Sequence, residues 1–405
     1  MAKVKIQGHA SGTGVITVTA PNTSTDRTIT LPDATDTLIG TATTDALTTR
    51  INAAGGRRNI IINGAMQVAQ RGTTSTSEGY ASVDRFFTYK ENTDQLTITQ
   101  ATHDTVPDGF GASWKIDVGT AETAIEANDL YQIVTRLEGQ DLQHLKFGTS
   151  SAQSITLQFW ARSSKTGTYV VHLYNSDAGR DITATYTINT INTWEHKTMT
   201  FAGDTVSGFT NDANRSLDIQ WQLMAGSNFT GTTSTSWGAL ADPRTANGQN
   251  TTWGESASDT FYITGVQLEL GSTATDFEHR SYGEELALCQ RYYHTAAYRL
   301  AIHTQTNAVL FNLDFPSTMR AIPSLSIFGS GNKSASTIYY EYAPWQNVGT
   351  ATSSAVSSGN LHQSGGAIRV TSTYSNSPSV GKPVAIFLAN RASANASYLI
   401  LDSEL

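Results

Sequence analysis

Charged residues are scarce in this chain. Only 15% of its 405 residues are Asp, Glu, Lys or Arg, against roughly 25% in an average soluble protein. Threonine, by contrast, occurs 59 times. Because threonine is β-branched and polar, it suits strands that keep one face in water, and the composition predicts a mainly β protein. The formal net charge of −8 argues against a nucleic-acid partner, whose binding surface would be basic.

Cysteine and long apolar segments are also missing. The single cysteine, Cys289, excludes an intrachain disulfide framework and a zinc site built from several cysteines. The longest apolar run is VAIFLA at 384–389, far short of the roughly 20 residues of a membrane helix. No apolar segment follows the N-terminal lysines, so neither a signal peptide nor membrane insertion is expected.

Motifs of known catalytic chemistry are absent as well. The sequence contains no G-x-S-x-G, no H-E-x-x-H and no phosphate-binding P-loop. Its histidines are isolated, without a second histidine or a cysteine at metal-ligand spacing. Two carboxylates that meet only in the folded protein would escape this search, so a glycoside hydrolase stays open as an alternative.

The central part of the chain, 57–280, has the pattern of a β-sandwich. Short segments rich in β-branched and aromatic residues recur at even spacing and are divided by turn residues. In SITLQFWARS, the side chains of Ile155, Leu157 and Phe159 share one face, as in a strand with one buried side. The expected strands are 58–63, 84–91, 95–101, 113–119, 129–138, 154–163, 168–175, 182–189, 194–201, 216–226 and 259–271.

Tryptophan positions add two expectations. Four tryptophans lie inside strand patterns and are predicted to fill the core: Trp114, Trp160, Trp194 and Trp221. Trp237 and Trp253 lie in a polar stretch, 227–258, that is long for a structureless loop. We expect these two rings to hold the stretch against the sandwich.

A helix is expected from Ser281 to Arg299, as a linker between two β domains. Leu286, Cys289 and Tyr293 form an apolar stripe at helical spacing. Cys289 is therefore predicted to be a buried small hydrophobic residue and not a nucleophile.

The N-terminal segment, 1–56, has short strand patterns but too few apolar residues for a core of its own. Val4 and Ile6 alternate with lysines, and such an open strand edge is a template for a partner's strand. A short helix is expected at 44–54, with Leu47 and Ile51 on one face. It is either a plain linker or a self-associating collar.

The C-terminal part, 300–405, is predicted to be a small β-sandwich domain. Tyr340, Tyr342 and Trp345 cluster in IYYEYAPW, beside a stretch without apolar period, 347–366, that predicts a loop and contains His362. Aromatic rings beside small polar loops are typical of sugar binding. The alternative is that these rings fill the small core.

Several segments together resemble bacteriophage tail fibre proteins that carry a jelly-roll domain like a carbohydrate-binding module. They are RNIIINGAMQVAQRG (58–72), DRFF (84–87), LKFGTSSAQSITLQFWARSSKTGTY (145–169), NTWEHKTMTFAGDT (192–205) and FYITGVQLELGSTATDFEHRSYGEELALCQRYY (261–293). The segment 314–329 and the ending YLILDSEL resemble the small β tip of such fibres, and the N-terminal segment their virion-proximal part. The resemblance implies a homotrimer located in the virion, anchored to the tail at its N-terminus, with receptor binding towards the C-terminus.

One departure from the jelly-roll pattern concerns calcium. In many such modules an acidic pair on the last strand helps to hold a structural calcium ion. This chain has Thr264 and Gly265 at the matching place in FYITGVQLE. This departure counts against a structural calcium ion, which stays open as an alternative, and no other cofactor is expected.

The sequence-based hypothesis is a phage tail fibre protein that binds a host surface glycan and is not an enzyme. Its predicted fold is mainly β, with an N-terminal anchoring segment, a jelly-roll sandwich, a linker helix and a small C-terminal tip. The predicted contacts are Tyr340, Tyr342, Trp345 and His362 for the receptor, Leu47 and Ile51 for the trimer, and Val4 and Ile6 for the virion. A depolymerising tailspike, a purely structural tail component, and a jelly roll that is only a spacer are the alternatives.

Overall fold

The computed structural model describes residues 58–405 except 94, 232–233, 297, 306–307, 330–336, 343–346, 363–364, 375–382 and 388–396. The chain divides into two compact units, Met1–Ala54 and Gly55–Leu405. The expectations for the N-terminal helix and for Val4, Ile6, Leu47 and Ile51 therefore lie outside the described residues.

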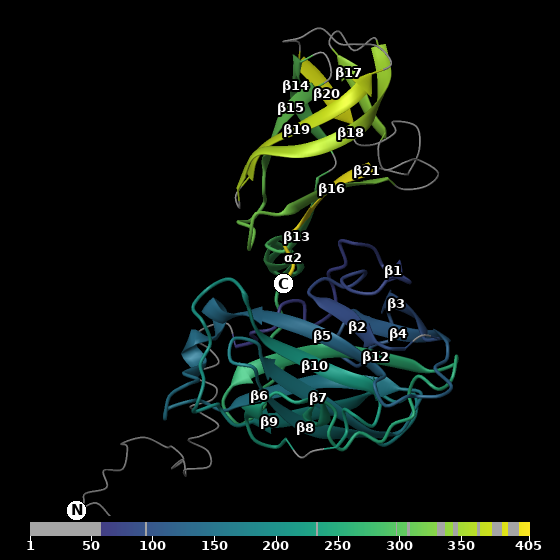
Figure 1. Ribbon diagram of the computed structural model, residues 1–405, viewed down its shortest axis with the longest axis vertical. Helices are drawn as coiled ribbons and strands as arrows, with labels where there is room; N and C mark the ends of the chain where they lie inside the picture. The colour runs from purple at the N-terminus through teal and green to yellow at the C-terminus, as the bar shows by residue number, and fades with distance from the viewer. Residues whose placement is uncertain are drawn as a thin grey trace, which may run out of the picture. The chain divides into compact units, whose positions relative to one another are not determined.

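A sandwich of two six-stranded antiparallel sheets follows, and it confirms the mainly β prediction (Figure 1). The first sheet, which we call sheet A, has the strand order β1-β3-β4-β12-β6-β9, and sheet B has the order β11-β8-β7-β10-β5-β2. Strands far apart in sequence pair centrally in both, as in a jelly roll. The bounds are β1 Thr74–Ser75, β2 Phe86–Glu91, β3 Thr97–His103, β4 Ser113–Thr120, β5 Leu130–Glu138, β6 Ile155–Ser163, β7 Gly167–Asn175, β8 Arg180–Ile188, β9 Glu195–Phe201, β10 Arg215–Ala225, β11 Gly238–Ala239 and β12 Thr260–Leu270.

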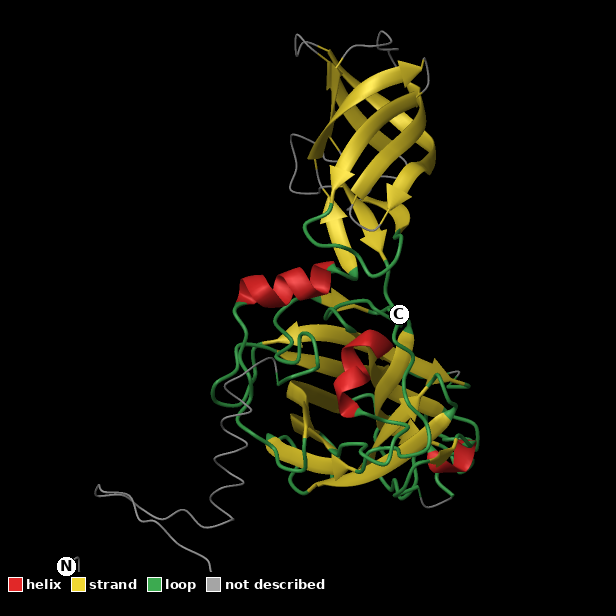
Figure 2. Cartoon of the chain, turned by 90° about the vertical axis from the view of Figure 1, so that its left-hand side faces the viewer, coloured by secondary structure: helices red, strands yellow, loops and turns green. Residues whose placement is uncertain are grey.

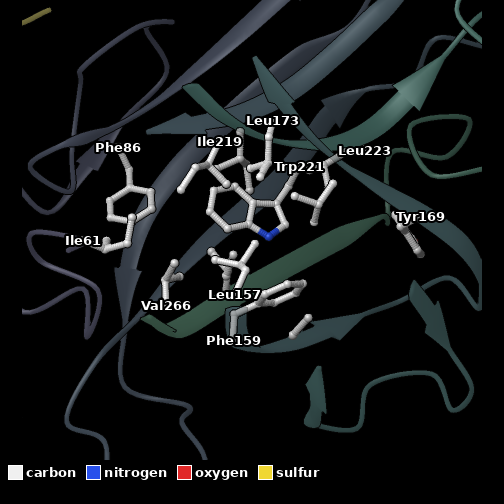
Figure 3. Close-up of a cluster of buried hydrophobic side chains, with 14 of the residues drawn as sticks. Ile61, Phe86, Leu157, Phe159, Tyr169, Leu173, Ile219, Trp221, Leu223 and Val266 are labelled. Carbon is white, nitrogen blue, oxygen red and sulfur yellow. The ribbon is translucent and has the colours of Figure 1, made fainter. Parts of the chain in front are cut away.

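The core lies between the sheets and is built mainly by alternation along the strands. Trp221 of β10 is fully buried at its centre, with its ring 5.7 Å from that of Phe159 and 6.3 Å from that of Phe86 (Figure 3). Trp114 is also fully buried. The prediction that these two tryptophans fill the core is confirmed.

Trp160 and Trp194 are not core residues, so that part of the prediction is wrong. Both are half-buried, on the outer face of sheet A. Trp160 lies between the inward-facing Phe159 and Ala161 and contacts His196, with 5.1 Å between ring centroids. Strand position alone does not fix the face, because neighbouring residues of a strand point to opposite sides.

The expected first strand, 58–63, is irregular backbone instead. Two asparagine side chains take up the hydrogen bonds that a neighbouring strand would have provided. Asn59 donates to the carbonyl of Val266 at 3.1 Å and accepts from the amide of Ile61 at 3.0 Å. Asn63, in a left-handed conformation, donates to the carbonyl of Val68 at 2.8 Å.

The long polar stretch after β10 is ordered against the sandwich, as predicted. It contains β11 and the short 3-10 helix η2, Asp242–Arg244; a longer one, η1, spans Gly139–Leu145. Trp253 is fully buried and stacks on Tyr131 at 5.6 Å. Trp237 donates through Nε1 to the carbonyl of Ala202 at 2.7 Å.

The linker helix is shorter than predicted: α2 spans Tyr282–Gln290 (red in Figure 2). Ser281 and Glu284 form a reciprocal capping box at its start. Cys289 is fully buried, as predicted. The residues beyond the helix turn into β13, Tyr293–Ala296, which pairs with the last strand, β21, Ser397–Asp402. Here tertiary pairing overrides the helical periodicity.

The C-terminal part is all β, but its strands close into a six-stranded barrel and do not form the expected small sandwich. The barrel order is β14-β15-β19-β18-β17-β20, and β13-β21-β16 form a separate sheet. The expected loop at 347–366 is mostly strand, because β18 pairs with β17 and β19 along its length. The bounds are β14 Tyr298–Gln305, β15 Ala308–Asp314, β16 Ser324–Gly329, β17 Thr337–Tyr342, β18 Asn347–His362, β19 Gly365–Tyr374 and β20 Pro383–Phe387.

The last residues of the chain contact the sandwich through a cluster of arginines. Glu404 forms an ion pair with the buried Arg85, and Arg71 lies 3.4 Å from the same carboxylate. The Arg136 guanidinium donates to the carbonyl oxygen of Leu405 at 2.5 Å. No described helix is long and apolar enough to cross a membrane.

Candidate functional site

A hollow of about 330 Å³ opens on the outer face of sheet B. Its floor is formed by the central strands β5, β10 and β7, and Tyr89 of β2 lines one side. Phe229, Leu240, Asp242 and Thr245, from the polar stretch after β10, line it as well. We call this hollow the sheet B cleft.

Alternation along β10 creates the floor of the cleft. Ile219, Trp221 and Leu223 point into the core, and all three are fully buried. Asp218 and Gln220, between them in sequence, therefore lie on the opposite face and line the cleft. Strand β5 repeats this pattern, with Gln132, Val134 and Arg136 as its cleft residues.

A continuous row of polar contacts crosses the floor from strand to strand. Gln222 donates to the side-chain oxygen of Gln132 at 2.9 Å, and its second contact is with Gln220 at 3.4 Å. The Gln220 side-chain oxygen lies 2.7 Å from Nδ1 of His172. Nε2 of His172 lies 3.2 Å from a carboxylate oxygen of Asp181. All five side chains are at least nine-tenths buried.

Arginines hold the two buried carboxylates of this face. Asp218 accepts from Nε of Arg215 at 2.7 Å and from its Nη2 at 2.5 Å, a bidentate pair. Burial alone would lower the pKa of Arg215. The hydrogen bonds to Asp218 and its negative charge outweigh this effect, so the pKa of Arg215 lies above its ordinary value. Nε of Arg136 lies 3.5 Å from Asp218, and Arg244 donates through Nε to Asp181. Neither carboxylate is left as an unengaged acid or base.

Aromatic rings border the polar floor. Tyr89 is 41% exposed, which is unusual for a large ring inside a strand. Tyr174 is half-buried, parallel to His172 within 17° and 6.4 Å from it between centroids. The guanidinium of Arg215 lies 5.4 Å above the Tyr174 ring, and that of Arg136 lies 4.5 Å from the Phe87 ring. These contacts limit the rotamers of the rings.

This arrangement suits the binding of a polyhydroxylated ligand. Amide and imidazole groups fixed by their neighbours can direct hydroxyl groups, and the exposed faces of aromatic rings can pack on the C–H face of a sugar. Among the described residues, no group of three or more His, Cys, Asp or Glu is placed to hold a metal ion.

The receptor residues expected from the sequence lie elsewhere. Tyr340 and Tyr342 belong to β17, and their backbones pair with Gly349 and Asn347 at the start of β18. His362 is the last residue of the 16-residue β18 and pairs with Gly365. His362 thus lies fifteen residues along β18 from Asn347, the partner of Tyr342, which is at most about 50 Å of strand, and it pairs with β19 and not with β17. Trp345 lies outside the described residues.

The sheet B cleft was not predicted from the sequence, although a signal for it exists. In DIQWQL, the residues Asp218, Gln220 and Gln222 occupy every second position of a central strand. Polar side chains on the outer face of an edge strand are ordinary, but here they are buried in the middle of a sheet. Burial of polar groups requires a specific set of partners, and that requirement indicates a site.

No family model and no curated protein matches the chain. Among solved structures, a putative sugar binding protein from Bacteroides thetaiotaomicron is 14% identical, with a TM-score of 0.30 over 53% of this chain and 100% of that one. A family 11 carbohydrate-binding module of a Clostridium thermocellum cellulase is 11% identical, with a TM-score of 0.26 over 50% of this chain and 97% of that one. The tripod from the baseplate of bacteriophage Tuc2009 is 12% identical, with a TM-score of 0.24 over 80% and 91%.

Proposed function

We propose that this chain is a phage tail fibre protein whose sandwich binds a glycan of the bacterial surface. The observation that carries the glycan part is the sheet B cleft, where buried amide and imidazole groups lie beside the exposed ring of Tyr89 and the half-exposed ring of Tyr174. The tail fibre part is supported by the resemblance of segments within 58–293 to such fibres.

Two aromatic rings test the glycan site. Each ring stacked on a sugar contributes roughly 0.5–1.5 kcal/mol, so replacing both Tyr89 and Tyr174 by alanine should weaken binding about tenfold or more. The measurement is retention of the purified chain on an array of bacterial surface polysaccharides, followed by titration of whatever is retained. Tyr282→Ala is the matched control, because that ring is 56% exposed on α2 and outside the cleft.

The expected result is loss of retention for the double variant, normal retention for the control, and unchanged melting of both. An array on which the parent chain binds no glycan would contradict the proposed function. Equal retention of parent and double variant would exclude the cleft as the site.

A depolymerising enzyme is the main rival, and the cleft offers little support for it. Glycoside hydrolysis needs one carboxyl group free to donate a proton and a second to act on the sugar or on water. Asp218 and Asp181, the buried carboxylates of this face, are both engaged by arginines. The other two carboxylates that line the cleft, Glu91 and Asp242, are exposed, whereas the general acid of a glycosidase is typically a carboxyl group in an apolar pocket. Release of reducing sugar ends from a retained polysaccharide would establish the enzyme.

The receptor site at the barrel remains a second proposal. Tyr340 and Tyr342 belong to β17, and Trp345 follows that strand in the sequence. We propose that these three rings contact the host receptor, with His362 as a further hydrogen-bonding residue. Alanine at Tyr342 and Trp345 should then reduce adsorption without changing glycan retention by the sandwich. Normal adsorption of that variant would refute the proposal.

Assembly and anchoring are proposals for the N-terminal unit. We propose that Leu47 and Ile51 face the axis of a homotrimer and that Val4 and Ile6 dock on the tail in the virion. Sedimentation at micromolar concentration should give a trimer mass, and particles lacking residues 1–40 should lose the fibre. A monomer, or a fibre retained without residues 1–40, would refute the respective proposal.

A further inference from the structure

The sheet B cleft differs chemically between its two ends. At one end, three residues on neighbouring strands lie side by side in one cross-strand row: Arg136 of β5, Asp218 of β10 and Tyr174 of β7. Arg215 reaches into this row from the start of β10. Glu91 lines the cleft at the other end, where it pairs with Leu130. Six residues of β5 separate the ends, roughly 20 Å.

Hydrogen-bond acceptors at the arginine end are already used. Asp218 is 1% exposed, accepts both Nε and Nη2 of Arg215, and is contacted by Gln220 at 3.4 Å. Asp181, on the next strand of the same row, accepts from Arg244 and contacts His172. A neutral sugar site normally offers carboxylate or carbonyl oxygens to the hydroxyl hydrogens of its ligand. These two carboxylates offer none.

Donors at the same end remain available. The side chain of Arg215 is 35% exposed, and within the described part of the chain its Nη1 makes no hydrogen bond. Asp218 fixes the guanidinium by its Nε and Nη2 edge, while the ring of Tyr174 lies 5.4 Å away. Arg136 lines the cleft beside it, 23% exposed in its side chain. Its Nη1 donates to Leu405, while its Nη2 has no hydrogen-bond partner among the described residues. A guanidinium held in this way is pre-organised to bind an oxyanion.

We infer that the ligand of the sheet B cleft is an anionic glycan whose acid group binds at Arg215 and Arg136. The inference rests on the proposed glycan-binding function and adds the ligand's charge and orientation. The acid group is a sugar carboxylate or a phosphate ester, since both are oxyanions that pair with guanidinium. The neutral remainder of the glycan runs towards Tyr89 and its neighbour Glu91, because the negative charge of Glu91 would repel the acid group at that end.

Matched pairs of glycans test the inference. Each polysaccharide retained on the array is titrated before and after reduction of its carboxyl groups to alcohols, and before and after dephosphorylation. Removal of the acid group should weaken binding about tenfold, since a charge-assisted hydrogen bond is lost. The treatment that causes the loss tells carboxylate from phosphate. Raising the salt concentration should weaken only the acidic member of each pair.

Arg215→Met supplies the protein arm. It should remove most of the affinity difference between the acidic member and its neutral partner, and this difference is the quantity compared with the parent chain, because Arg215 also contacts Tyr174 and Asp218. Lys115→Met is the control, because Lys115 lies on β4 of sheet A and pairs with Asp117. Equal binding of acidic and neutral members, or an Arg215 variant that binds the acidic member normally, would overturn the inference. If neutral and acidic glycans bind equally well and binding still depends on Tyr174, the proposed glycan-binding function stands and only the inference about the acid group fails. If no glycan binds, both fall.

Discussion

Asp84 shows at the residue scale how the interior of this protein changes a side chain's acidity. Burial raises the pKa of Asp84 to about 6, although hydrogen bonds from Gln70 and the charge of Arg71 oppose the shift. The carboxylate accepts from the amide of Gln70 at 3.0 Å and from its side chain at 2.6 Å. It lies beside the contact of the chain's last residues, since Arg71 is shared with Glu404.

The raised pKa of Asp84 predicts a loss of stability as the pH rises. Between the unfolded value of about 4 and the folded value of about 6, the folded state binds more protons, so the stabilisation is complete below pH 4 and lost above pH 6. Two pKa units correspond to roughly 3 kcal/mol. Relative to Asp84→Asn, the parent chain should lose about that much free energy of unfolding between pH 4 and pH 7.

Urea unfolding curves at pH 4, 5, 6 and 7 measure this difference. The exposed Asp108, changed to asparagine, serves as the control and should give a flat difference. A flat difference for Asp84→Asn as well would mean that Asp84 ionises normally in the folded chain.

At the scale of the element, β12 owes its shape to one glycine. Its pairing with β6 shifts register between Thr264 and Gln267, and Gly265 between them has φ of 63°. A Cβ atom there would lie 2.7 Å from the ring of Phe110 and 3.0 Å from that of Trp160. Gly265 is thus a β-bulge residue.

Gly265→Ala should therefore destabilise the sandwich. A left-handed conformation costs an alanine about 1–2 kcal/mol, and the contact with Phe110 adds to that. Gly283→Ala on α2 is a control with the opposite sign. No atom lies within 4 Å of the place where its Cβ would be, and alanine favours a helix by up to about 1 kcal/mol. Thermal melting of both variants checks the pair, and a Gly265 variant as stable as the parent would contradict the account of the bulge.

Hydrophobic periodicity predicted strands well where one face of the strand is buried. It predicted them poorly where side-chain hydrogen bonds or pairing with distant strands decides the backbone conformation. Strands such as β6 and β10 were predicted within a residue or two because apolar residues alternate along them. The irregular 58–63 segment depends on hydrogen bonds of Asn59 and Asn63 that no pattern reports. Strand β18 has almost no apolar alternation, and only its two neighbours in the barrel make it a strand.

The site was harder to predict than the fold for the same reason. Clusters of aromatic residues are visible in a sequence, and that signal predicted a site at Tyr340 and Tyr342. The cleft is instead assembled from β2, β5, β7 and β10 and from the stretch after β10, each contributing two to four residues. Its polar row depends on cross-strand register, such as Gln220 opposite His172, and register is not readable from one strand.

On the scale of the whole molecule, the last residues link the C-terminal strands to the sandwich. Ser403 donates its amide to the carbonyl of Tyr292 at 2.8 Å, and Arg320 donates to the carbonyls of Ser403 and Glu404. Arg85, 2% exposed in its side chain, depends on Glu404 for its ion pair. Arg136, held by Leu405, is also a cleft residue, so the chain's end supports one end of the site.

Removing the charge of Glu404 should therefore destabilise the protein strongly. Glu404→Gln leaves a buried guanidinium without its carboxylate, which costs about 3–5 kcal/mol in comparable pairs. Guanidinium-chloride unfolding measures the loss, with Glu255→Gln as an exposed control expected within about 0.5 kcal/mol of the parent. If the free energy of unfolding of Glu404→Gln equals that of the Glu255→Gln control, the contact contributes nothing to stability.

The central claim is that the sheet B cleft holds the glycan, and a crystal structure of the chain with a retained oligosaccharide tests it most directly. The account predicts a sugar ring packed against Tyr174 or Tyr89, hydroxyl groups directed by the Gln132–Gln220–His172 row, and the acid group at Arg215. An oligosaccharide bound at the end of β17, with the cleft empty in the same crystal, would contradict it.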